Sequence, residues 1–513
     1  MRKTLGIFVA VSALSRHASA RAILTYQGRW NTEISQGLAK HHECLSKSYF
    51  GAYGQGPTHI FISEFDCLNH VRPSPDDPSE MTIMQDDFLQ SPGVLFWLEG
   101  AAVADSVRNV GDKTAAQDIM DFIERANTGA GFDYSTEVVP NNGAQMPMKR
   151  GPTLQDSNTA NSVSLLFAAG SRALVSISPS LIPELDKSLP KYIRPTMLPT
   201  SPLPLHGEKT KKAAKHLQSI LANLRFNPDI AALTSSISLE KMQNNIRWLT
   251  GEDPTSPIAS RHSFSPDARV AANWIQKKFE DAGAKCKQKP FLDGFAPNVI
   301  CRFQGTEDTD ELVILSGHYD SRGSFGSLRA PGGDDDGSGV TQVLAIAQAI
   351  SDNEISFRKN VELITFAGEE QGLLGSRAYA AELHRENANI TLMIQADMLA
   401  YHDPAEPLQL GLPQYIGLPE AAQLVANVSK LYSPELTVGL TAACCSDHQS
   451  FHEQGFPATQ VFERAGPIID PMYHNSGDVS ERSGYDLGQV RSIAKVTFAT
   501  LLEVAGFSLP PKE

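Results

Sequence analysis

Apolar positions between residue 237 and the C-terminus follow two spacings that alternate along the chain. Short runs rich in β-branched residues are typical of buried strands, and longer segments with an apolar residue every three or four positions are typical of helices. The strand-like runs are Asn298–Phe303, Leu312–Leu315, Val361–Phe366, Thr391–Ala396 and Thr459–Phe462. The helix-like segments are Val340–Ile350, Leu373–Leu383, Leu418–Tyr432 and Leu487–Val504. This alternation predicts an α/β domain whose mixed, mostly parallel central sheet carries helices on both faces.

One further helix has clear boundary signals. Ser265 is a favoured N-cap residue, and Pro266 suits the first helical position because its missing N–H would be unpaired there anyway. An apolar face with helical spacing follows, and Gly283 ends the segment. We therefore expect a helix that starts at Pro266 and stops before Gly283.

Residues 21–195 lack this regular alternation. Short apolar runs mix with a helix-like stretch at 115–126, and no catalytic motif or repeat period is visible. Four prolines between residues 195 and 204, followed by a charged stretch, are typical of a linker. Because 513 residues exceed the usual size of one hydrophobic core, we expect a separate N-terminal α+β accessory domain or pro-domain at 21–195, a linker region at 196–236 and a catalytic domain at 237–513.

The first twenty residues have the pattern of a secretory signal peptide. Arg2 and Lys3 form a basic start, Leu5–Leu14 is an apolar run, and residues 18–20 (Ala-Ser-Ala) match a small-residue cleavage site. The run is shorter than the roughly 20 apolar residues that span a membrane, which argues against an N-terminal anchor. We therefore expect cleavage before Arg21 and a secreted protein, with the lumen of a vacuole as an alternative destination.

The charge of the chain disfavours two classes of partner. The formal net charge is −14, and removal of the three basic residues of the signal peptide lowers it to −17. A chain this acidic is unsuited to binding nucleic acid or an anionic membrane surface. We expect a monomer with neither kind of partner.

Six cysteines and two glycosylation sequons, at Asn389 and Asn427, agree with the secretory route. Proximity in sequence favours the disulfides Cys44–Cys67 and Cys286–Cys301. It leaves the adjacent Cys444 and Cys445 as a vicinal bridge or as free thiols.

Four side chains suited to metal binding follow strand-like runs, namely His318, Glu369, Glu370 and Asp397. The carboxyl ends of parallel strands share one edge of a sheet, where ligands bind, so we expect these side chains to lie together. A lone histidine after a strand is more often structural, but carboxylates that would share its metal are also present. Adjacent side chains on extended backbone point to opposite sides, so one of the two glutamates can bind metal while the other reaches a metal-bound water.

Three consecutive aspartates, Asp334–Asp336, stand in a glycine-rich turn before a predicted helix. Their charges repel one another unless a cation lies among them. A helix cap would need only one such residue, so the cluster favours a divalent metal over a solvated cap. Asp320, two residues after His318, is the kind of carboxylate that orients a metal-binding imidazole.

Together these segments resemble the M28 family of zinc exopeptidases, which contains bacterial and fungal leucine-type aminopeptidases. The resemblance covers roughly residues 240–505. The motifs that carry it are Gly317–Ser321, Ala330–Gly339, Ala367–Ser376, Gln395–Met398, Cys445–His448 and Tyr473–Asp478.

The resemblance implies two zinc ions that share one aspartate: His318, Asp335 and Asp397 around one, and Asp335, Glu370 and His474 around the other. Glu369 would be the general base and acid for a metal-bridging water. Asp320 would orient His318, and Asp478 is a second candidate for such a role. Ser446–His448 would lie near the substrate or simply start the next helix.

One departure from the family pattern is visible. Some secreted members have a Cys-x-x-x-Cys bridge that ends where Cys445 stands, with a tyrosine two residues before it that assists the oxyanion. Thr441 and Ala443 occupy the other two positions here. Loss of one oxyanion donor can cost about 3 kcal/mol of transition-state stabilisation.

The sequence therefore predicts a secreted two-zinc aminopeptidase that hydrolyses the N-terminal bond of peptides and proteins. A carboxypeptidase of the same family is one alternative, with Arg322, Arg329 or Arg464 to bind the substrate carboxylate. A single-zinc cyclase is another, which the continuation Glu370–Gly375 disfavours. A non-catalytic binding protein on the same scaffold is the third, although every expected ligand and Glu369 are present.

Overall fold

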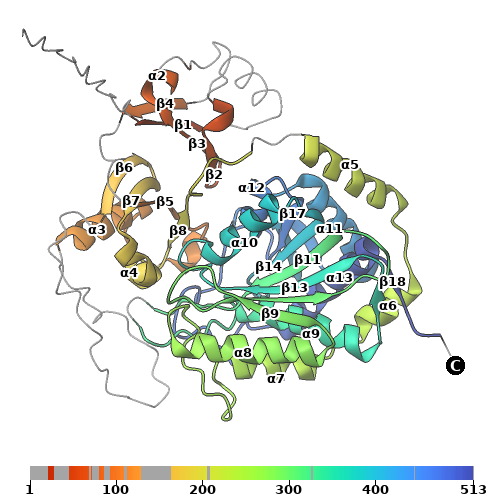
Figure 1. The fold of residues 1–513 in the computed structure, drawn as a ribbon. Helices are drawn as coiled ribbons and strands as arrows, with labels where there is room; N and C mark the ends of the chain where they lie inside the picture. The colour runs from red at the N-terminus through yellow and green to blue at the C-terminus, as the bar shows by residue number, and fades with distance from the viewer. Residues whose placement is uncertain are drawn as a thin grey trace, which may run out of the picture.

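Figure 1 shows the computed structural model, which describes residues 21–27, 45–68, 71, 80–85, 93–108, 112–128, 163–204, 208–324, 327–443 and 445–511. The predicted signal peptide lies outside the described residues. Among the helices of the described segments, none is both long enough and apolar enough to cross a membrane.

A six-stranded sheet forms the centre of the C-terminal part, in the order β17-β14-β11-β13-β10-β9. The strands β17, β14, β11 and β13 run parallel, and β10 and β9 pair antiparallel at one edge. The predicted mixed, mostly parallel sheet is confirmed. Its strands are β9 (Lys285–Lys289), β10 (Asn298–Phe303), β11 (Glu311–His318), β13 (Asn360–Phe366), β14 (Asn389–Ala396) and β17 (Ala458–Val461).

Helices cover both faces of this sheet, because successive side chains of a strand point to opposite sides. In β11, Val313 and Leu315 join one hydrophobic cluster, whereas Leu312 and Ile314 join another. The first cluster includes residues of α7 (Leu239–Leu249), α8 (Pro266–Asp281), α9 (Gly337–Asp352), α11 (Pro419–Tyr432) and α13 (Leu487–Ala505). The second includes residues of α10 (Leu374–Arg385) and α12 (His448–Glu453).

Helix α8 begins as the sequence predicts. The Ser265 hydroxyl accepts a hydrogen bond from the Ala268 N–H, and Pro266 takes the first turn. The helix ends at Asp281, and Gly283 follows with a φ of 93° that favours glycine.

Short elements complete the C-terminal part. Two two-stranded sheets pair β12 (Ser356–Phe357) with β18 (Phe507–Ser508) and β15 (Gln409–Pro413) with β16 (Thr437–Thr441). The predicted disulfide Cys286–Cys301 is present and joins directly paired positions of β9 and β10. Cys67 and Cys445 are also disulfide-bonded, so Cys445 is not a free thiol, but Cys44 and Cys444 lie outside the described residues.

The N-terminal part contains two four-stranded antiparallel sheets with the same strand order. The first runs β2-β3-β1-β4 and the second β6-β7-β5-β8, so β1 to β4 correspond in sequence to β5 to β8. A short helix precedes the last strand of each, α2 (Phe65–Leu68) and α4 (Leu185–Ser188). The matching order indicates an internal duplication that no sequence period reveals.

The first sheet comprises β1 (Arg21–Gln27), β2 (Tyr49–Tyr53), β3 (Thr58–Glu64) and β4 (Glu80–Gln85). The second comprises β5 (Val94–Gly100), β6 (Val163–Ala169), β7 (Arg172–Ile177) and β8 (Ile193–Met197), with α3 (Ala115–Thr128) beside it. Three 3₁₀-helices are also described, at Leu45–Lys47, Asp105–Val107 and Pro179–Glu184.

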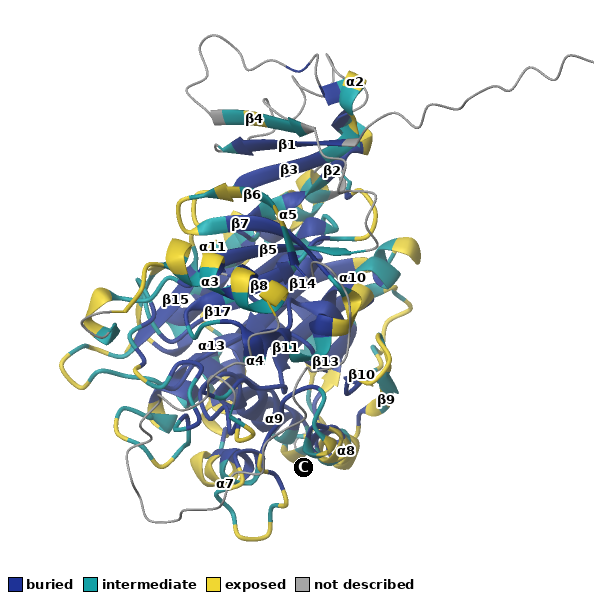
Figure 2. Ribbon diagram, turned by 90° about the vertical axis from the view of Figure 1, so that its left-hand side faces the viewer, coloured by how far each residue is buried: buried dark blue, intermediate teal, exposed yellow. Residues whose placement is uncertain are grey.

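Figure 2 shows the first N-terminal sheet above the second, and the second sheet next to the C-terminal part. Ile23 and Trp97 belong to one cluster that joins the two N-terminal sheets. Phe96 and Leu374 belong to another, which joins the second sheet to the C-terminal part. Strand β8 runs across the predicted boundary at residue 195, and the predicted linker region holds α5 (Glu208–Asn223) and α6 (Pro228–Ser235).

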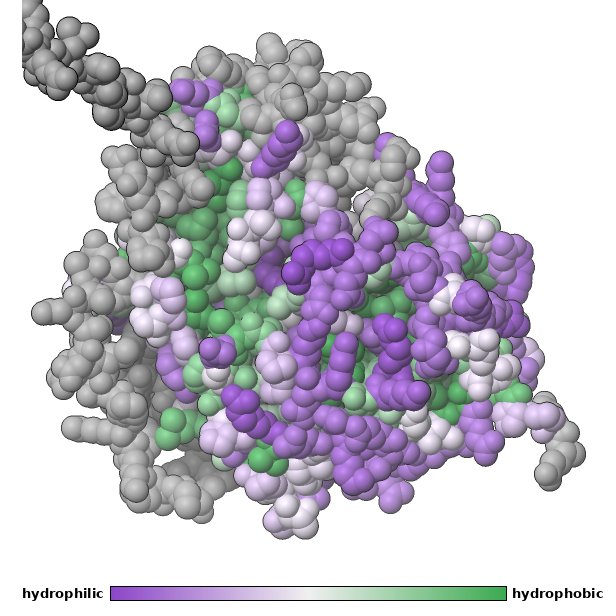
Figure 3. All heavy atoms as spheres, in the orientation of Figure 1, coloured by the Kyte–Doolittle hydropathy of each residue, from purple (hydrophilic) through white to green (hydrophobic). Residues whose placement is uncertain are grey.

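On the face drawn in Figure 3, hydrophilic side chains predominate over the part of the molecule that contains the central sheet.

Candidate metal centre

The side chains that the sequence places after strands meet at the carboxyl ends of the parallel strands. His318 is the last residue of β11, Glu369 and Glu370 follow β13, and Asp397 follows β14. All four are buried. Their meeting follows from the parallel arrangement, which brings the ends of β11, β13 and β14 side by side.

Asp335, from the turn before α9, lies between two histidines. Its Oδ1 is 3.3 Å from His318 Nε2, and its Oδ2 is 3.3 Å from His474 Nε2. Glu370 Oε2 is also 3.3 Å from His474 Nε2. His474 comes from the loop between β17 and α13. One carboxylate oxygen of Asp335 thus faces each histidine, which is the arrangement of a bridging ligand.

Distances alone divide the side chains into two metal-binding groups: His318, Glu369 and Asp397, and Asp335, Glu370 and His474. The first group holds Glu369 where the sequence predicts Asp335. However, His318 Nε2 lies closer to Asp335, at 3.3 Å, than to Glu369 Oε2, at 3.9 Å. Asp335 can therefore serve both groups, which leaves Glu369 beside the metal positions.

The donor atoms fit a bound cation. His318 Nε2 and Glu370 Oε1 are buried and lack a hydrogen-bond partner within the described part of the chain, and such atoms are costly unless something binds them. The Nδ1 atoms lie 3.1 Å from the Asp320 carbonyl oxygen in His318 and 2.8 Å from the Lys191 carbonyl oxygen in His474. Donation from Nδ1 leaves Nε2 of each ring available to a metal. Nitrogen and carboxylate ligands in this number suit zinc.

Burial opposes charge throughout the cluster and raises the pKa of Glu369 well above its ordinary value. Burial also lowers the pKa of His318, but Glu369 and the other carboxylates outweigh this effect and raise it well above the usual range. For Asp335, burial works toward a higher pKa, and the two neighbouring histidines hold the pKa below its ordinary value. A cation bound among these groups would neutralise the same carboxylates.

The other two aspartates of the turn face backbone N–H groups. Asp336 accepts hydrogen bonds from three of them and Asp334 from two. Asp478 accepts from the N–H groups of Asp334 and Asp335. Gly339 permits the close packing, because a Cβ there would lie 2.4 Å from Asp336 Oδ1. Only Asp335 turns its carboxylate toward the histidines.

Asp320 acts differently from the sequence expectation. Its carboxylate accepts hydrogen bonds from the backbone N–H groups of Glu369 and Glu370, both at 3.3 Å. The distance from its Oδ1 to His318 Nδ1 is 3.7 Å, too long for a hydrogen bond. The carbonyl of Asp320 orients His318, and the side chain positions the two glutamates.

Comparison with known proteins agrees with this geometry. Residues 298–500 match the family model described as Peptidase family M28. The chain carries an M28 peptidase domain. The predicted family and the predicted metallopeptidase class are confirmed.

Curated relatives match about half of this chain. A "Probable leucine aminopeptidase" of Arthroderma otae is 28% identical over 289 residues, which are 54% of this chain and 75% of the relative. "Leucine aminopeptidase 1" of Sclerotinia sclerotiorum is 27% identical over 298 residues, 54% of this chain and 74% of the relative.

A solved structure, the LapA aminopeptidase of Legionella pneumophila, shares the fold with a TM-score of 0.53 at 18% identity. The match covers 96% of that chain and 69% of this one, more than residues 237–513 make up. The likeness in fold therefore extends into the N-terminal part.

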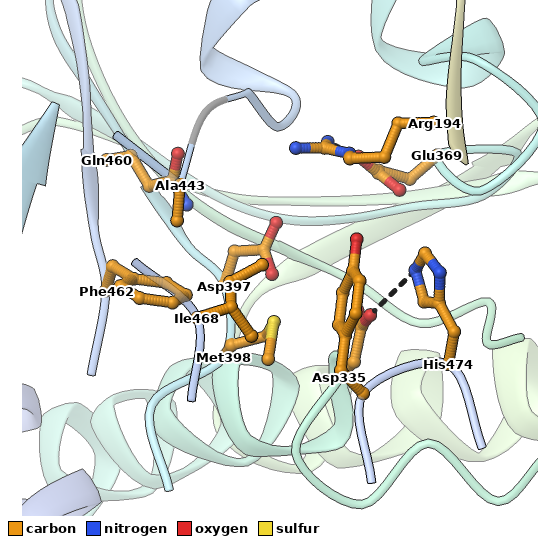
Figure 4. A pocket seen from close by; sticks show the side chains of 11 residues that line it. Arg194, Asp335, Glu369, Asp397, Met398, Ala443, Gln460, Phe462, Ile468 and His474 are labelled. Carbon is orange, nitrogen blue, oxygen red and sulfur yellow. Dashed lines mark hydrogen bonds and ion pairs between the residues drawn. The ribbon is translucent and has the colours of Figure 1, made fainter. Parts of the chain in front are cut away.

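The N-terminal part reaches the metal centre of the M28 domain. Besides the Lys191 carbonyl, it contributes Arg194 of β8, whose Nη2 lies 3.4 Å from Glu369 Oε1 and donates a hydrogen bond to the Cys445 carbonyl. Figure 4 shows Arg194 beside Glu369, at the edge of a cavity of about 20 Å³. No local motif marks these residues, because the partners of Arg194 are 175 and 251 positions away.

The remaining predicted residues are not among the ligating side chains, although Arg322 Nη1 lies 3.1 Å from His474 Nδ1. Ser446–His448 start α12 and are buried, which matches the alternative that they begin a helix. Arg322 donates to carbonyl groups of the N-terminal part, including those of Leu189 and Ile193. Arg464 pairs with Glu406, and Arg329 is exposed. None of these three arginines lines the cavity.

Proposed function

We propose that the chain is a two-zinc aminopeptidase that removes the first residue of peptides. The observation that carries the proposal is the position of Asp335 between two histidines, in a chain whose curated relatives are named leucine aminopeptidases. The residues that would hold the ions are His318, Asp335 and Asp397 for one, and Asp335, Glu370 and His474 for the other. Bound there, two zinc ions would supply Lewis acidity to the scissile carbonyl and to the attacking water.

Glu369 would move the protons. Its Oε2 faces His318 at 3.9 Å, and its Oε1 faces Arg194 at 3.4 Å. From this position its carboxylate would accept a proton from the attacking water and then donate it to the leaving amine. Asp320 would keep Glu369 in place through the backbone.

One wall of the cavity would bind the first residue of the substrate. Met398, Ala443, Phe462 and Ile468 line it, and an apolar wall suits an apolar side chain. The carboxylates of the centre would attract the free amine, whereas an acetylated amine would lose this attraction.

The N-terminal part would remain with the mature enzyme as an accessory region, because it supplies a carbonyl and a cation to the metal centre. We further propose that the protein is secreted after cleavage before Arg21. N-terminal sequencing of protein collected from the medium tests this, and retention of residues 1–20 would contradict it.

Three tripeptides test the reaction on the zinc-loaded protein: Leu-Ala-Ala, its N-acetyl form and its C-terminal amide. The proposal predicts hydrolysis of the free peptide and of the amide, with release of leucine, and no hydrolysis of the acetylated peptide. The reverse pattern, with the acetylated peptide cleaved and the amide resistant, would identify a carboxypeptidase. Release of ammonia from an N-terminal glutamine peptide would indicate a cyclase instead.

A further inference from the structure

Arg194 is not one of the expected zinc ligands, but it is a cation from the N-terminal part that lies beside the proposed base. Its side chain is 19% exposed, and it lines the cavity together with Asp335, Glu369 and Asp397. Burial works against its charge, but Tyr473, Glu369 and Asp397 raise its pKa above the usual range of arginine. The guanidinium is therefore charged whenever a substrate arrives.

Arg194 contacts the C-terminal part through the Cys445 carbonyl, but it is not alone in docking the N-terminal part. Docking has its own contacts: Arg322 donates to the carbonyls of Leu189, Pro190 and Ile193, and Asp186 pairs with His262 at 3.0 Å. Within the described part of the chain, the side-chain hydrogen bonds of Arg194 all use Nη2. A guanidinium has five N–H donors in a planar fork, so Nε and Nη1 remain available to a ligand in the cavity.

The distance between Arg194 and Glu369 indicates which group of a peptide substrate Arg194 would contact. A general acid that protonates the leaving amine lies about 3 Å from that nitrogen. In a dipeptide, the terminal carboxylate is two bonds beyond the same nitrogen, about 3 Å further on. Because Arg194 Nη2 is 3.4 Å from Glu369 Oε1, it can reach this carboxylate. The apolar wall of Met398 and Phe462 lies on the other side of the centre, beyond Asp397 (Figure 4).

The size of the cavity favours a substrate that gives Arg194 a new partner. About 20 Å³ holds little more than a water molecule, so a substrate can enter only if lining side chains move, and Arg194 is one of them. A substrate carboxylate would compensate for the displacement of Arg194 by accepting two parallel charge-assisted hydrogen bonds from it. A substrate with a neutral amide at the same point offers the guanidinium no new anionic partner.

We propose that Arg194 is a specificity-determining residue, which binds a carboxylate on the residue that follows the scissile bond, so that dipeptides with a free C-terminus are favoured substrates. This inference rests on the proposed aminopeptidase function and adds the substrate class. An aspartate side chain at the second position offers the same chemistry. The N-terminal part then forms the wall of the substrate site that binds the leaving group.

The test compares kcat/KM of the zinc-loaded full chain for three substrates: Leu-Ala, Leu-Ala amide and Leu-Asp amide. The expected wild-type preference for Leu-Ala over Leu-Ala amide is about 10- to 100-fold, the range for one charge-assisted contact. In Arg194→Met this ratio falls to near 1, and in Arg194→Lys it is intermediate. Effects through Glu369 act on both substrates and cancel in the ratio. Thermal unfolding shows whether each variant is folded.

Arg172→Met is the matched control, because Arg172 lies on β7 and donates to the Gly56 carbonyl, away from the cavity. It keeps the wild-type ratio. A preference for Leu-Asp amide over Leu-Ala amide that Arg194→Met abolishes supports the proposal with a side-chain carboxylate as the source. A wild-type ratio near 1 with good turnover overturns the inference and leaves the proposed function standing. So does a rise in activity of Arg194→Met on all three substrates, which would make Arg194 a blocking group. Lack of hydrolysis of every substrate overturns the proposed function as well.

Discussion

At the residue scale, the centre consists of ligating atoms and of the groups that hold them. His474 and Met398 have φ values of 50° and 51°. Residues other than glycine rarely adopt this backbone conformation, and those that do are often found at functional sites. Met398 directly follows Asp397. The surrounding hydrogen bonds keep both residues in this conformation. The positions of Asp397 and of the His474 ring depend on it.

Replacement of Glu369 by Gln separates the proposed base from the ligands. The amide keeps the shape of the side chain but cannot accept the proton, so we expect kcat to fall by about 10²- to 10⁴-fold with the zinc content unchanged. Activity and metal analysis on the same sample measure both effects. Loss of zinc together with activity would instead make Glu369 a ligand, as the grouping by distance alone suggests.

Asp320→Ala tests the positioning role of that carboxylate. The change removes the acceptor of two backbone N–H groups and leaves the carbonyl that orients His318. We expect a lower kcat with little change in zinc affinity. If zinc affinity fell as much as it does in His318→Ala, Asp320 would act through the imidazole, as the sequence suggests.

At the scale of elements, α4 and the segment before α8 are joined by the buried pair of Asp186 and His262. Burial works toward a higher pKa for Asp186, but the charge and hydrogen bond of His262 outweigh it and lower the pKa to about 2. A carboxylate whose pKa is lowered by folding stabilises the folded state at pH values above its unfolded pKa of about 3.9. This stabilisation is lost as the pH falls toward 2.

Asp186→Asn should therefore be less stable than wild type at pH 5, by about 2 kcal/mol from this charge interaction, and the difference should shrink as pH falls from 4 to 2. Urea unfolding at several pH values measures it, with Asp293→Asn, at an exposed position, as the control. A difference that stays constant over this window would show that the pair does not stabilise the fold through charge.

The elements of the M28 domain follow from local pattern. Strand β10 has the bounds that the sequence predicts, and α8 starts at the predicted proline, because apolar spacing and capping act within a few residues. The convergence of His318, Glu369, Glu370 and Asp397 also follows, since parallel strands end at one edge. The contact between β8 and the centre does not, because nothing near Arg194 in sequence signals a partner 175 positions away.

At the scale of the whole molecule, the N-terminal and C-terminal parts share hydrophobic clusters. Tyr192 packs in one cluster with Met398, Phe462 and Tyr473, and Leu374 joins residues of β5 and β7. A backbone hydrogen bond also joins the two parts, from the Met197 N–H of β8 to the Gly372 carbonyl in the turn before α10. A sequence boundary at residue 195 divides the chain within β8, and separation there would expose these apolar side chains to water.

We therefore expect one cooperative thermal unfolding transition for the metal-loaded chain, with the β5–β8 sheet unfolding together with the M28 domain. Calorimetry of the wild-type protein, with Trp97 fluorescence as a local probe, measures this. Two well-separated transitions, with Trp97 reporting the earlier one, would mean that the N-terminal part is an independent domain.

The central claim is that two zinc ions share Asp335. Anomalous X-ray scattering at the zinc edge, from crystals of the zinc-loaded protein, tests it most directly. The account predicts two zinc peaks, one next to His318 and Asp397 and the other next to Glu370 and His474, with Asp335 in contact with both and Glu369 with neither. A single peak, or a zinc ion coordinated by Glu369 in place of Asp335, would contradict it.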